Sequence, residues 1–174
     1  MTERQISSST LVLGGARSGK SAFAEQLAIE SNLTPVYLAT GQAFDSEMEK
    51  RIAKHQIDRG THWHTIEEPI ELLETLQTES RHDRVILVDC LTLWVSNLMM
   101  SDKNLETEFR SLSASVSTLK GPIIFVSNEV GQGIVPDNAM AREFRDYAGR
   151  LHQLIASTVE SVYFVTAGLS QKLK

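Results

Sequence analysis

Five short apolar runs stand out along the chain, and most of them are continuous rather than alternating with polar residues. Continuous β-branched runs are typical of strands that are covered on both faces, as in a parallel sheet between two layers of helices. The runs lie at residues 11–14, 36–39, 85–89, 123–127 and 162–166. We therefore predict a central, mostly parallel sheet.

Apolar residues at helical spacing fill the intervals between these runs. In residues 21–30, Phe23 and Leu27 lie four positions apart, and a longer pattern covers residues 139–161 after a capping signal at residues 137–138. Strand and helix thus alternate along the whole chain. This order predicts a three-layer α/β domain whose ligands gather at the carboxyl ends of the strands.

Length and charge narrow the functional classes. The 174 residues fit one domain, in which the polar residues 1–8 are expected to be loose. A formal net charge of −5 argues against general electrostatic binding to nucleic acid or to an anionic membrane. The sequence has neither an apolar run of the ~18 residues that span a bilayer nor a signal peptide's apolar centre, so we expect a cytoplasmic protein. The single cysteine, Cys90, is interpreted as a small buried apolar residue.

The clearest chemical motif follows the first predicted strand. It is a complete G-x-x-x-x-G-K-[ST] phosphate-binding loop, placed between a strand and a helix. In such a loop glycines let the backbone fold around phosphate oxygens, Lys20 reaches the β- and γ-phosphates, and the Ser21 hydroxyl ligates Mg²⁺. Asp89, at the end of a buried strand, is the expected second Mg²⁺ ligand, a helix cap being its alternative role. The candidate loop residues are Gly14, Gly15, Ala16, Arg17, Ser18, Gly19, Lys20 and Ser21.

The loop implies that a nucleoside triphosphate binds, but it leaves three classes of protein open: a small-molecule kinase, a GTPase switch and an ATP-driven motor. A GTPase should carry Asn-Lys-x-Asp after a later strand, whereas the candidate at residues 127–130 is Ser-Asn-Glu-Val. A motor needs additional surface for a polymer or partner, and this short acidic chain offers little. A small-molecule transferase is therefore favoured, and a pure nucleotide-binding regulator is the alternative.

A second group of candidates follows the second predicted strand. One helical face carries the apolar residues Phe44, Met48 and Ile52. His55 falls on the same face, among the basic residues Arg51, Lys54 and Arg59. Basic neighbours attract phosphate and a neutral imidazole is a competent nucleophile, so His55 is a candidate nucleophile, with a structural role as the alternative. The competing histidines are His62 and His64, whereas His82 lies in a polar, solvated stretch and His152 in the last predicted helix.

Two further features have weaker signals. Residues 128–138 form a polar loop with two glycines and a proline at a strand's carboxyl end, which favours a shaped site, and Arg142 and Arg145 beyond it are candidate phosphate contacts. Either Glu67 or Glu68 is a candidate to hold a sugar hydroxyl. The Trp63 side chain either packs against the protein or provides a surface on which a ring can stack.

Five segments together closely resemble the bifunctional adenosylcobinamide kinase/adenosylcobinamide-phosphate guanylyltransferases of cobalamin biosynthesis. The segments are residues 14–21, Ala39-Thr40-x-Gln42, Arg51-Ile52-x-x-His55, His62-Trp63 and residues 128–136. The resemblance covers residues 11–174. The phosphate-binding loop alone is common, whereas the other four segments in this order and spacing are much more specific.

This resemblance implies a RecA type of phosphate-loop domain that assembles as a homotrimer. It implies transfer of a γ-phosphate from ATP or GTP to the aminopropanol hydroxyl of adenosylcobinamide. GMP from GTP is then added to adenosylcobinamide phosphate, which gives adenosylcobinamide-GDP. His55 is the residue that the resemblance makes the guanylylated nucleophile. The other nucleotide contacts that it implies are Thr40, Gly41, Gln42, Gln56, Ile57, Asp58, Arg59, Glu67 and Asp89.

Overall fold

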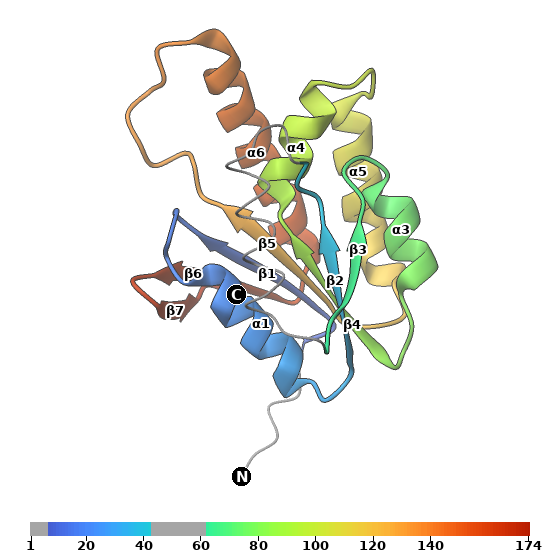
Figure 1. Cartoon of the computed structure of the whole chain (residues 1–174). Helices are drawn as coiled ribbons and strands as arrows, with labels where there is room; N and C mark the ends of the chain where they lie inside the picture. The colour runs from blue at the N-terminus through green and yellow to red at the C-terminus, as the bar shows by residue number, and fades with distance from the viewer. Residues whose placement is uncertain (1–6, 43–61) are drawn as a thin grey trace.

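The computed structural model describes residues 7–42 and 62–174. Within these ranges the chain forms a seven-stranded sheet in the order β3-β2-β4-β5-β1-β6-β7 (Figure 1). All neighbouring strands pair in parallel except β6 and β7. The strands are β1 (Ser9–Gly14), β2 (Thr34–Ala39), β3 (His64–Glu67), β4 (Arg84–Asp89), β5 (Ile123–Asn128), β6 (Ser161–Thr166) and β7 (Leu169–Lys172). The mostly parallel sheet predicted from the apolar runs is confirmed.

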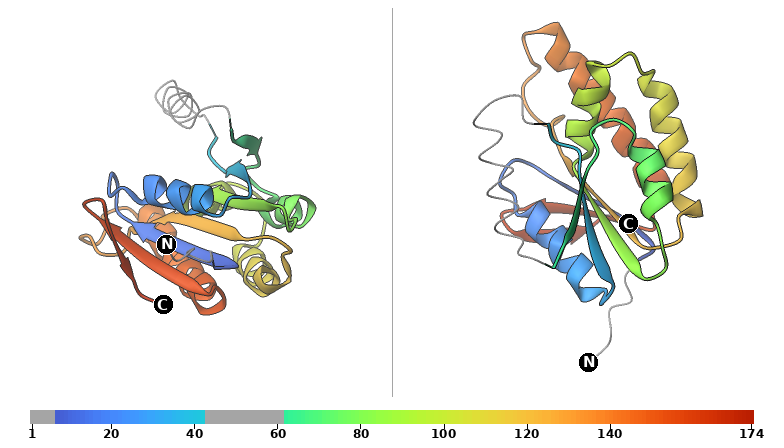
Figure 2. Two further views of the ribbon diagram at one scale, coloured as in Figure 1. Left: turned by 90° about the horizontal axis from the view of Figure 1, so that it is seen from below. Right: turned by 45° about the vertical axis from the view of Figure 1, so that its right-hand side comes forward.

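Helices cover both faces of this sheet, so the described part of the chain has three layers (Figure 2). One face is covered by α1, and the other by the remaining helices, which share one core cluster. The helices are α1 (Lys20–Glu30), α3 (Leu72–Glu79), α4 (Leu91–Met99), α5 (Leu105–Ser115) and α6 (Ala139–Thr158), with a 3₁₀ turn at Val116–Thr118. The predicted three-layer α/β architecture is confirmed. None of the helices in the described ranges is long and apolar enough to cross a membrane.

The last helix is shorter than predicted. Its pattern predicted residues 139–161, but α6 ends at Thr158 and Val159 already has extended backbone. The Ile155 carbonyl accepts both the Val159 N–H at 2.9 Å and the Thr158 hydroxyl at 3.0 Å, which closes the last turn of the helix. Ser161 then pairs with Thr10 of β1. Pairing with the central strand thus overrides the local helical pattern.

Two strands are absent from the sequence-based prediction. β3 is an edge strand of four residues, one half-buried and three exposed. β7 pairs antiparallel with β6 at the other edge, and all four of its residues are exposed. An edge strand with little buried surface needs no continuous apolar run, so its sequence carries little signal.

The core is divided into two clusters, one on each face of the sheet. The larger cluster lies under α3 to α6 and includes Trp94, Phe109 and Phe125, all fully buried. The smaller cluster lies under α1 and includes Val12 and Val126. Because side chains alternate along a strand, β4 and β5 contribute to both clusters, which explains their continuous apolar runs. The carboxyl ends of these parallel strands meet at one edge of the sheet, where α1 begins.

Candidate nucleotide-binding site

The phosphate-binding loop joins the carboxyl end of β1 to the start of α1 (Figure 1). Gly14 has no room for a side chain, because a Cβ atom there would lie 2.4 Å from Ser18 Oγ and 2.6 Å from the Val165 carbonyl oxygen. Gly19 has a φ of 94°, a left-handed conformation that other residues rarely adopt. These two glycines let the loop curl tightly against β6.

Lys20 begins α1 and is 9% exposed. Its Nζ donates to the Gly15 carbonyl at 3.1 Å, so the side chain folds back across the loop. The loop is also held by the turn between β6 and β7, where the Gly168 N–H donates to the Ser18 carbonyl at 2.7 Å. The first N–H groups of a helix lack helical partners, and its N-terminus is electropositive. The site therefore offers phosphates both backbone N–H groups and an ammonium group.

Asp89 ends β4, and its side chain lies on the face of the sheet that α1 covers, because Val85 and Leu87 at alternate positions belong to the α1 cluster. Tyr37 Oη donates to Asp89 Oδ2 at 2.5 Å and thereby orients the carboxylate. The Asp89 carboxylate and the Ser21 hydroxyl are oxygen donors, which Mg²⁺ prefers. No group of three His, Cys, Asp or Glu side chains that could hold a metal occurs in the described ranges. This donor set therefore fits Mg²⁺ bound together with nucleotide phosphates, rather than a cage made of protein alone.

Thr40, the first predicted nucleotide contact after β2, is fully buried. Its hydroxyl donates to the Cys90 carbonyl at 2.7 Å and accepts from the Cys90 N–H at 2.9 Å. Its carbonyl accepts from Asn97 Nδ2 at 2.7 Å. Thr40 therefore ties the end of β2 to the end of β4. Gly41 and Gln42, both half-buried, follow it at the edge of the sheet.

Cys90 is buried, as the sequence predicts. Burial, and to a smaller extent the neighbouring Asp89 carboxylate, raises the pKa of its thiol to about 11. The thiol therefore stays protonated at neutral pH and is no thiolate nucleophile.

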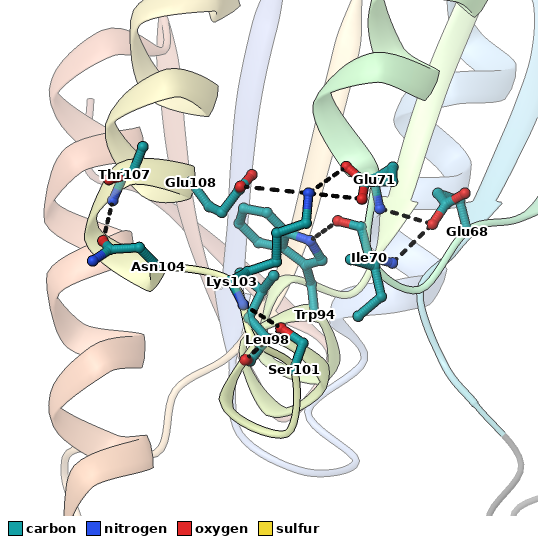
Figure 3. Close-up of polar contacts among 10 residues, drawn as sticks. All are labelled: Glu68, Ile70, Glu71, Trp94, Leu98, Ser101, Lys103, Asn104, Thr107 and Glu108. Atoms are coloured by element: carbon teal, nitrogen blue, oxygen red, sulfur yellow. Dashed lines mark hydrogen bonds and ion pairs between the residues drawn. The ribbon is translucent and has the colours of Figure 1, made fainter.

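The two adjacent glutamates at the end of β3 have different environments. Glu67 is exposed and pairs in register with Ala39 at the end of β2. Glu68 uses its carboxylate locally, because Oε1 accepts from the backbone N–H groups of Ile70 and Glu71, both at 2.8 Å (Figure 3). Glu67 is therefore the exposed carboxylate of the pair, beside the end of β2.

The histidines outside α6 divide into exposed and undescribed residues. His62, His64 and His82 are exposed, as predicted for His82. Trp63 packs edge-on against Tyr37 with 5.9 Å between ring centroids, which supports the packing interpretation. The candidate site residues His55, Gln56, Ile57, Asp58 and Arg59 lie outside the described ranges, as does the predicted helical face with Phe44, Met48 and Ile52 and the basic residues Arg51 and Lys54. Their predicted roles stay predictions.

His152 of α6 is buried against the end of β5. Its Nε2 lies 2.7 Å from Ser127 Oγ, and its Nδ1 lies 4.0 Å from Glu129 Oε2. Burial lowers the pKa of His152, and the Glu129 carboxylate opposes that shift. The imidazole is therefore mostly neutral at pH 7, and it ties α6 to the strand that runs beside β1.

The loop that follows β5 is more apolar on its surface than its glycines suggest. Ile134 is 96% exposed and Val135 is 63% exposed. Arg142, a candidate phosphate contact, donates from Nη1 to two carbonyls of this loop, those of Pro136 and Asp137. In the described structure this guanidinium thus holds the loop to the start of α6.

A polar group that the sequence analysis missed lies where the end of β5 meets the start of α4. Asn128 Nδ2 donates to Thr92 Oγ1 at 3.0 Å, and Thr92 Oγ1 lies 3.1 Å from Cys90 Sγ. Asn128 lies in a segment that the sequence analysis had singled out, but nothing local marks Thr92. Only the pairing of the strands brings these side chains together.

Comparisons with known families and proteins agree with one another. A family model described as cobinamide kinase / cobinamide phosphate guanyltransferase matches residues 10–173. The bifunctional adenosylcobalamin biosynthesis protein CobP of Pseudomonas aeruginosa is 51% identical over 166 residues, which cover 94% of this chain and 96% of that protein. The bifunctional adenosylcobalamin biosynthesis protein CobU of Escherichia coli is 38% identical, with coverage of 94% and 98%.

A solved structure extends the likeness to the fold. An ATPase from the type III secretion system of pathogenic bacteria superposes with a TM-score of 0.55 at 11% sequence identity. The match covers 94% of this chain and 56% of that one. At such low identity the likeness concerns the fold alone, which is that of phosphate-loop NTPases.

Proposed function

The chain belongs to the cobinamide kinase / cobinamide phosphate guanyltransferase family, and from this premise we propose that it converts adenosylcobinamide to adenosylcobinamide-GDP in two steps. In the first step it phosphorylates adenosylcobinamide, and in the second it transfers GMP from GTP to the phosphorylated product. One observation carries the proposal: a complete phosphate-binding loop and the Asp89 carboxylate share one face and one edge of the sheet. They do so in a chain that is half identical to a bifunctional protein.

In the kinase step the chain's own groups position and neutralise the triphosphate. The N–H groups at the start of α1 bind phosphate oxygens, and Lys20 exchanges its contact with the Gly15 carbonyl for the β- and γ-phosphates. Ser21 and Asp89 would hold Mg²⁺, which would neutralise charge on the phosphates. Little covalent chemistry is left for the protein, so positioning of the acceptor hydroxyl controls the rate.

The guanylyl step requires a nucleophile, for which we propose His55. Its imidazole attacks the α-phosphorus of GTP, pyrophosphate leaves, and the phosphoramidate then passes GMP to the phosphate of the acceptor. The support for His55 is its match to the guanylylated histidine of the family and its basic neighbours in the sequence. Gly41, Gln42 and Glu67 supply further nucleotide contacts at the ends of β2 and β3.

The nucleotide specificity of the two steps should differ. The chain has no Asn-Lys-x-Asp sequence after β5 to bind guanine. We propose that the guanylyl step requires GTP, whereas the kinase step accepts ATP or GTP. The corrin ring of the substrate is large, so a pocket at the boundary between subunits of a homotrimer would accommodate it.

The test uses two labels on the purified full chain with Mg²⁺. With γ-labelled ATP and adenosylcobinamide, label should appear in adenosylcobinamide phosphate; with α-labelled GTP, label should stay on the denatured chain. The adduct should be labile to acid and stable to alkali, as expected of a phosphate bound to nitrogen. A protein that binds both nucleotides but transfers neither label is a nucleotide-binding regulator, and the proposal is then wrong.

The variant His55→Ala separates the two reactions. It should keep measurable kinase activity and form neither the GMP adduct nor adenosylcobinamide-GDP. His62→Ala and His64→Ala, which change exposed imidazoles close by in the sequence, are the matched controls and should keep the adduct. Loss of the adduct in a control variant, with retention in His55→Ala, would assign the nucleophile to the other histidine.

A further inference from the structure

Asn128 occupies a position between the two halves of the phosphate site. It ends β5, the strand that lies between β4, which carries Asp89, and β1, which leads into the phosphate-binding loop. Its register partner on β1 is Gly14, the first residue of the loop. Its side chain lies on the α1 face, because Val126, two residues earlier, belongs to the α1 cluster. Asn128 therefore shares both the edge and the face with the loop and with Asp89.

Hydrogen bonds fix the orientation of the Asn128 amide. Nδ2 donates to Thr92 Oγ1 at 3.0 Å and contacts Cys90 Sγ at 3.9 Å. The backbone N–H of Asn128 also donates to Thr92 Oγ1, at 3.4 Å. Cys90 caps the start of α4 and Thr92 lies in its first turn, and α4 follows β4, the neighbour of β5 on the side away from β1. The amide nitrogen thus faces the start of α4, and no donor of the described residues bonds to Oδ1.

Thr92 is the centre of this arrangement. It is 3% exposed, and its Oγ1 joins the Asn128 amide to Cys90 Sγ, 3.1 Å away. Thr92 Oγ1 accepts from both the backbone N–H and the amide N–H of Asn128, and these two bonds hold the amide in the orientation described.

We propose that Asn128 Oδ1 accepts a hydrogen bond from the hydroxyl group that attacks the γ-phosphate, and that Thr92 is the positioning residue that turns the amide for this purpose. An amide oxygen beside phosphates repels their oxygens, so its partner must be a donor. The attacking alcohol is the donor that the reaction must bring to this edge. The inference rests on the kinase step proposed above and adds an acceptor-binding residue to it.

The amide orients the alcohol but takes no proton, because it is not a base. The alcohol oxygen forms the new bond to the γ-phosphorus, and the bond from that phosphorus to the bridging oxygen breaks. The electron pair leaves on the nucleoside diphosphate, and one H⁺ is released to solvent. Orientation of the acceptor is a major contribution in such a transfer, since small misplacements slow it strongly.

Steady-state kinetics of adenosylcobinamide phosphorylation test the proposal on four full-length variants. Asn128→Ala should lower kcat about 100-fold, with the KM for ATP changed by less than about threefold. Thr92→Val, which keeps the shape but removes the hydroxyl, should lower kcat about tenfold, and Thr92→Ser should restore it. Ser113→Ala removes another buried hydroxyl, on α5, and is the matched control. It should retain the wild-type kcat, and thermal unfolding checks that each variant is folded.

Each outcome decides the proposal. The pattern of kcat values above supports it. If Thr92→Val fails to fold, Asn128→Ala still tests the proposal, because Asn128 is only half-buried. Equal loss in Thr92→Ser and Thr92→Val, or in Ser113→Ala, would show that packing is the cause and would overturn it. A raised KM for ATP with unchanged kcat would place Asn128 in nucleotide binding and would also overturn it. A wild-type chain without kinase activity would refute the proposed function. A wild-type rate in Asn128→Ala would instead overturn only the proposed role of Asn128.

Discussion

The two faces of the sheet differ in what they bury and in what they carry. Toward α3 to α6 the sheet packs against large, fully buried side chains such as Trp94 and Phe109. Toward α1 the apolar cluster is smaller. At the carboxyl ends of the strands this face carries Asp89 and Asn128, and Lys20 lies at the start of α1. One face therefore provides most of the hydrophobic stabilisation, and the other presents the chemical groups.

The physical reason lies in the number of helices that cover each face. Among the described residues a single helix, α1, covers one face, and its N-terminus points at the strand ends, where its backbone N–H groups can bind a phosphate. Buried polar groups at this edge are tolerated because they are bonded to one another, as Thr40 is to Cys90. Substitutions on the two faces should therefore separate activity from stability.

The largest effect is expected at the edge on the α1 face. Lys20→Ala should lower the kcat/KM of the kinase step about 1,000-fold, about 4 kcal/mol of transition-state stabilisation, because a preorganised charge is lost. Its free energy of unfolding should change little. Kinetics with γ-labelled ATP measure the first quantity and urea denaturation the second. Lys120→Ala, which removes an exposed ammonium group, is the control. A near-normal kinase rate in folded Lys20→Ala would show that the phosphate-binding loop does not take part in the reaction.

The opposite face should show the reverse pattern. Phe109 is fully buried and lies with its ring 5.9 Å from that of Trp94. Phe109→Ala should cost about 4 kcal/mol of unfolding free energy in urea, through lost burial and the cavity left behind, and leave kcat unchanged while the protein is folded. Phe23→Ala, on the half-buried flank of α1, should cost less. Equal costs for the two substitutions would contradict the difference between the faces.

His152 should make stability depend on pH. Burial lowers its pKa, so the unfolded chain binds the proton more readily, and stability is present above about pH 6.5 and lost as the pH falls below it. His152→Leu should remove this dependence. It should also cost about 2 kcal/mol at pH 7.5, because the buried Ser127 hydroxyl loses its partner. Urea denaturation between pH 5 and 8 compares the two proteins, and identical pH profiles would show that His152 does not titrate on unfolding.

The smallest effect is expected at a single helix cap on the face that α3 to α6 cover. Asn104 Oδ1 accepts from the Thr107 N–H at 3.0 Å and caps the start of α5 (Figure 3). Asn104→Ala should cost about 1 kcal/mol of unfolding free energy, with no effect on either reaction. Asn104→Asp preserves an acceptor and is the control. A loss of activity in Asn104→Ala would mean that the helices of this face affect the site.

The sequence alone determined the parts of the protein that depend on local pattern. The continuous apolar runs predicted β1, β4 and β5, since strands buried on both faces need apolar residues at every position. The spacing of glycines, Lys20 and Ser21 identified the phosphate-binding loop, because the geometry of that loop is local to eight residues. The exposed edge strands β3 and β7 were missed, because a strand with little buried surface leaves no such pattern.

Only the tertiary structure decided how residues far apart in the sequence work together. The hydroxyl of Thr40 bonds the backbone of Cys90, fifty positions along the chain, which no local pattern indicates. Asn128 meets Thr92 because β4 and β5 are neighbours in the sheet, not because of any motif. Hydrogen bonds of this kind depend on strand order and register, which are set by packing of the whole domain and leave no trace in the local order of residues.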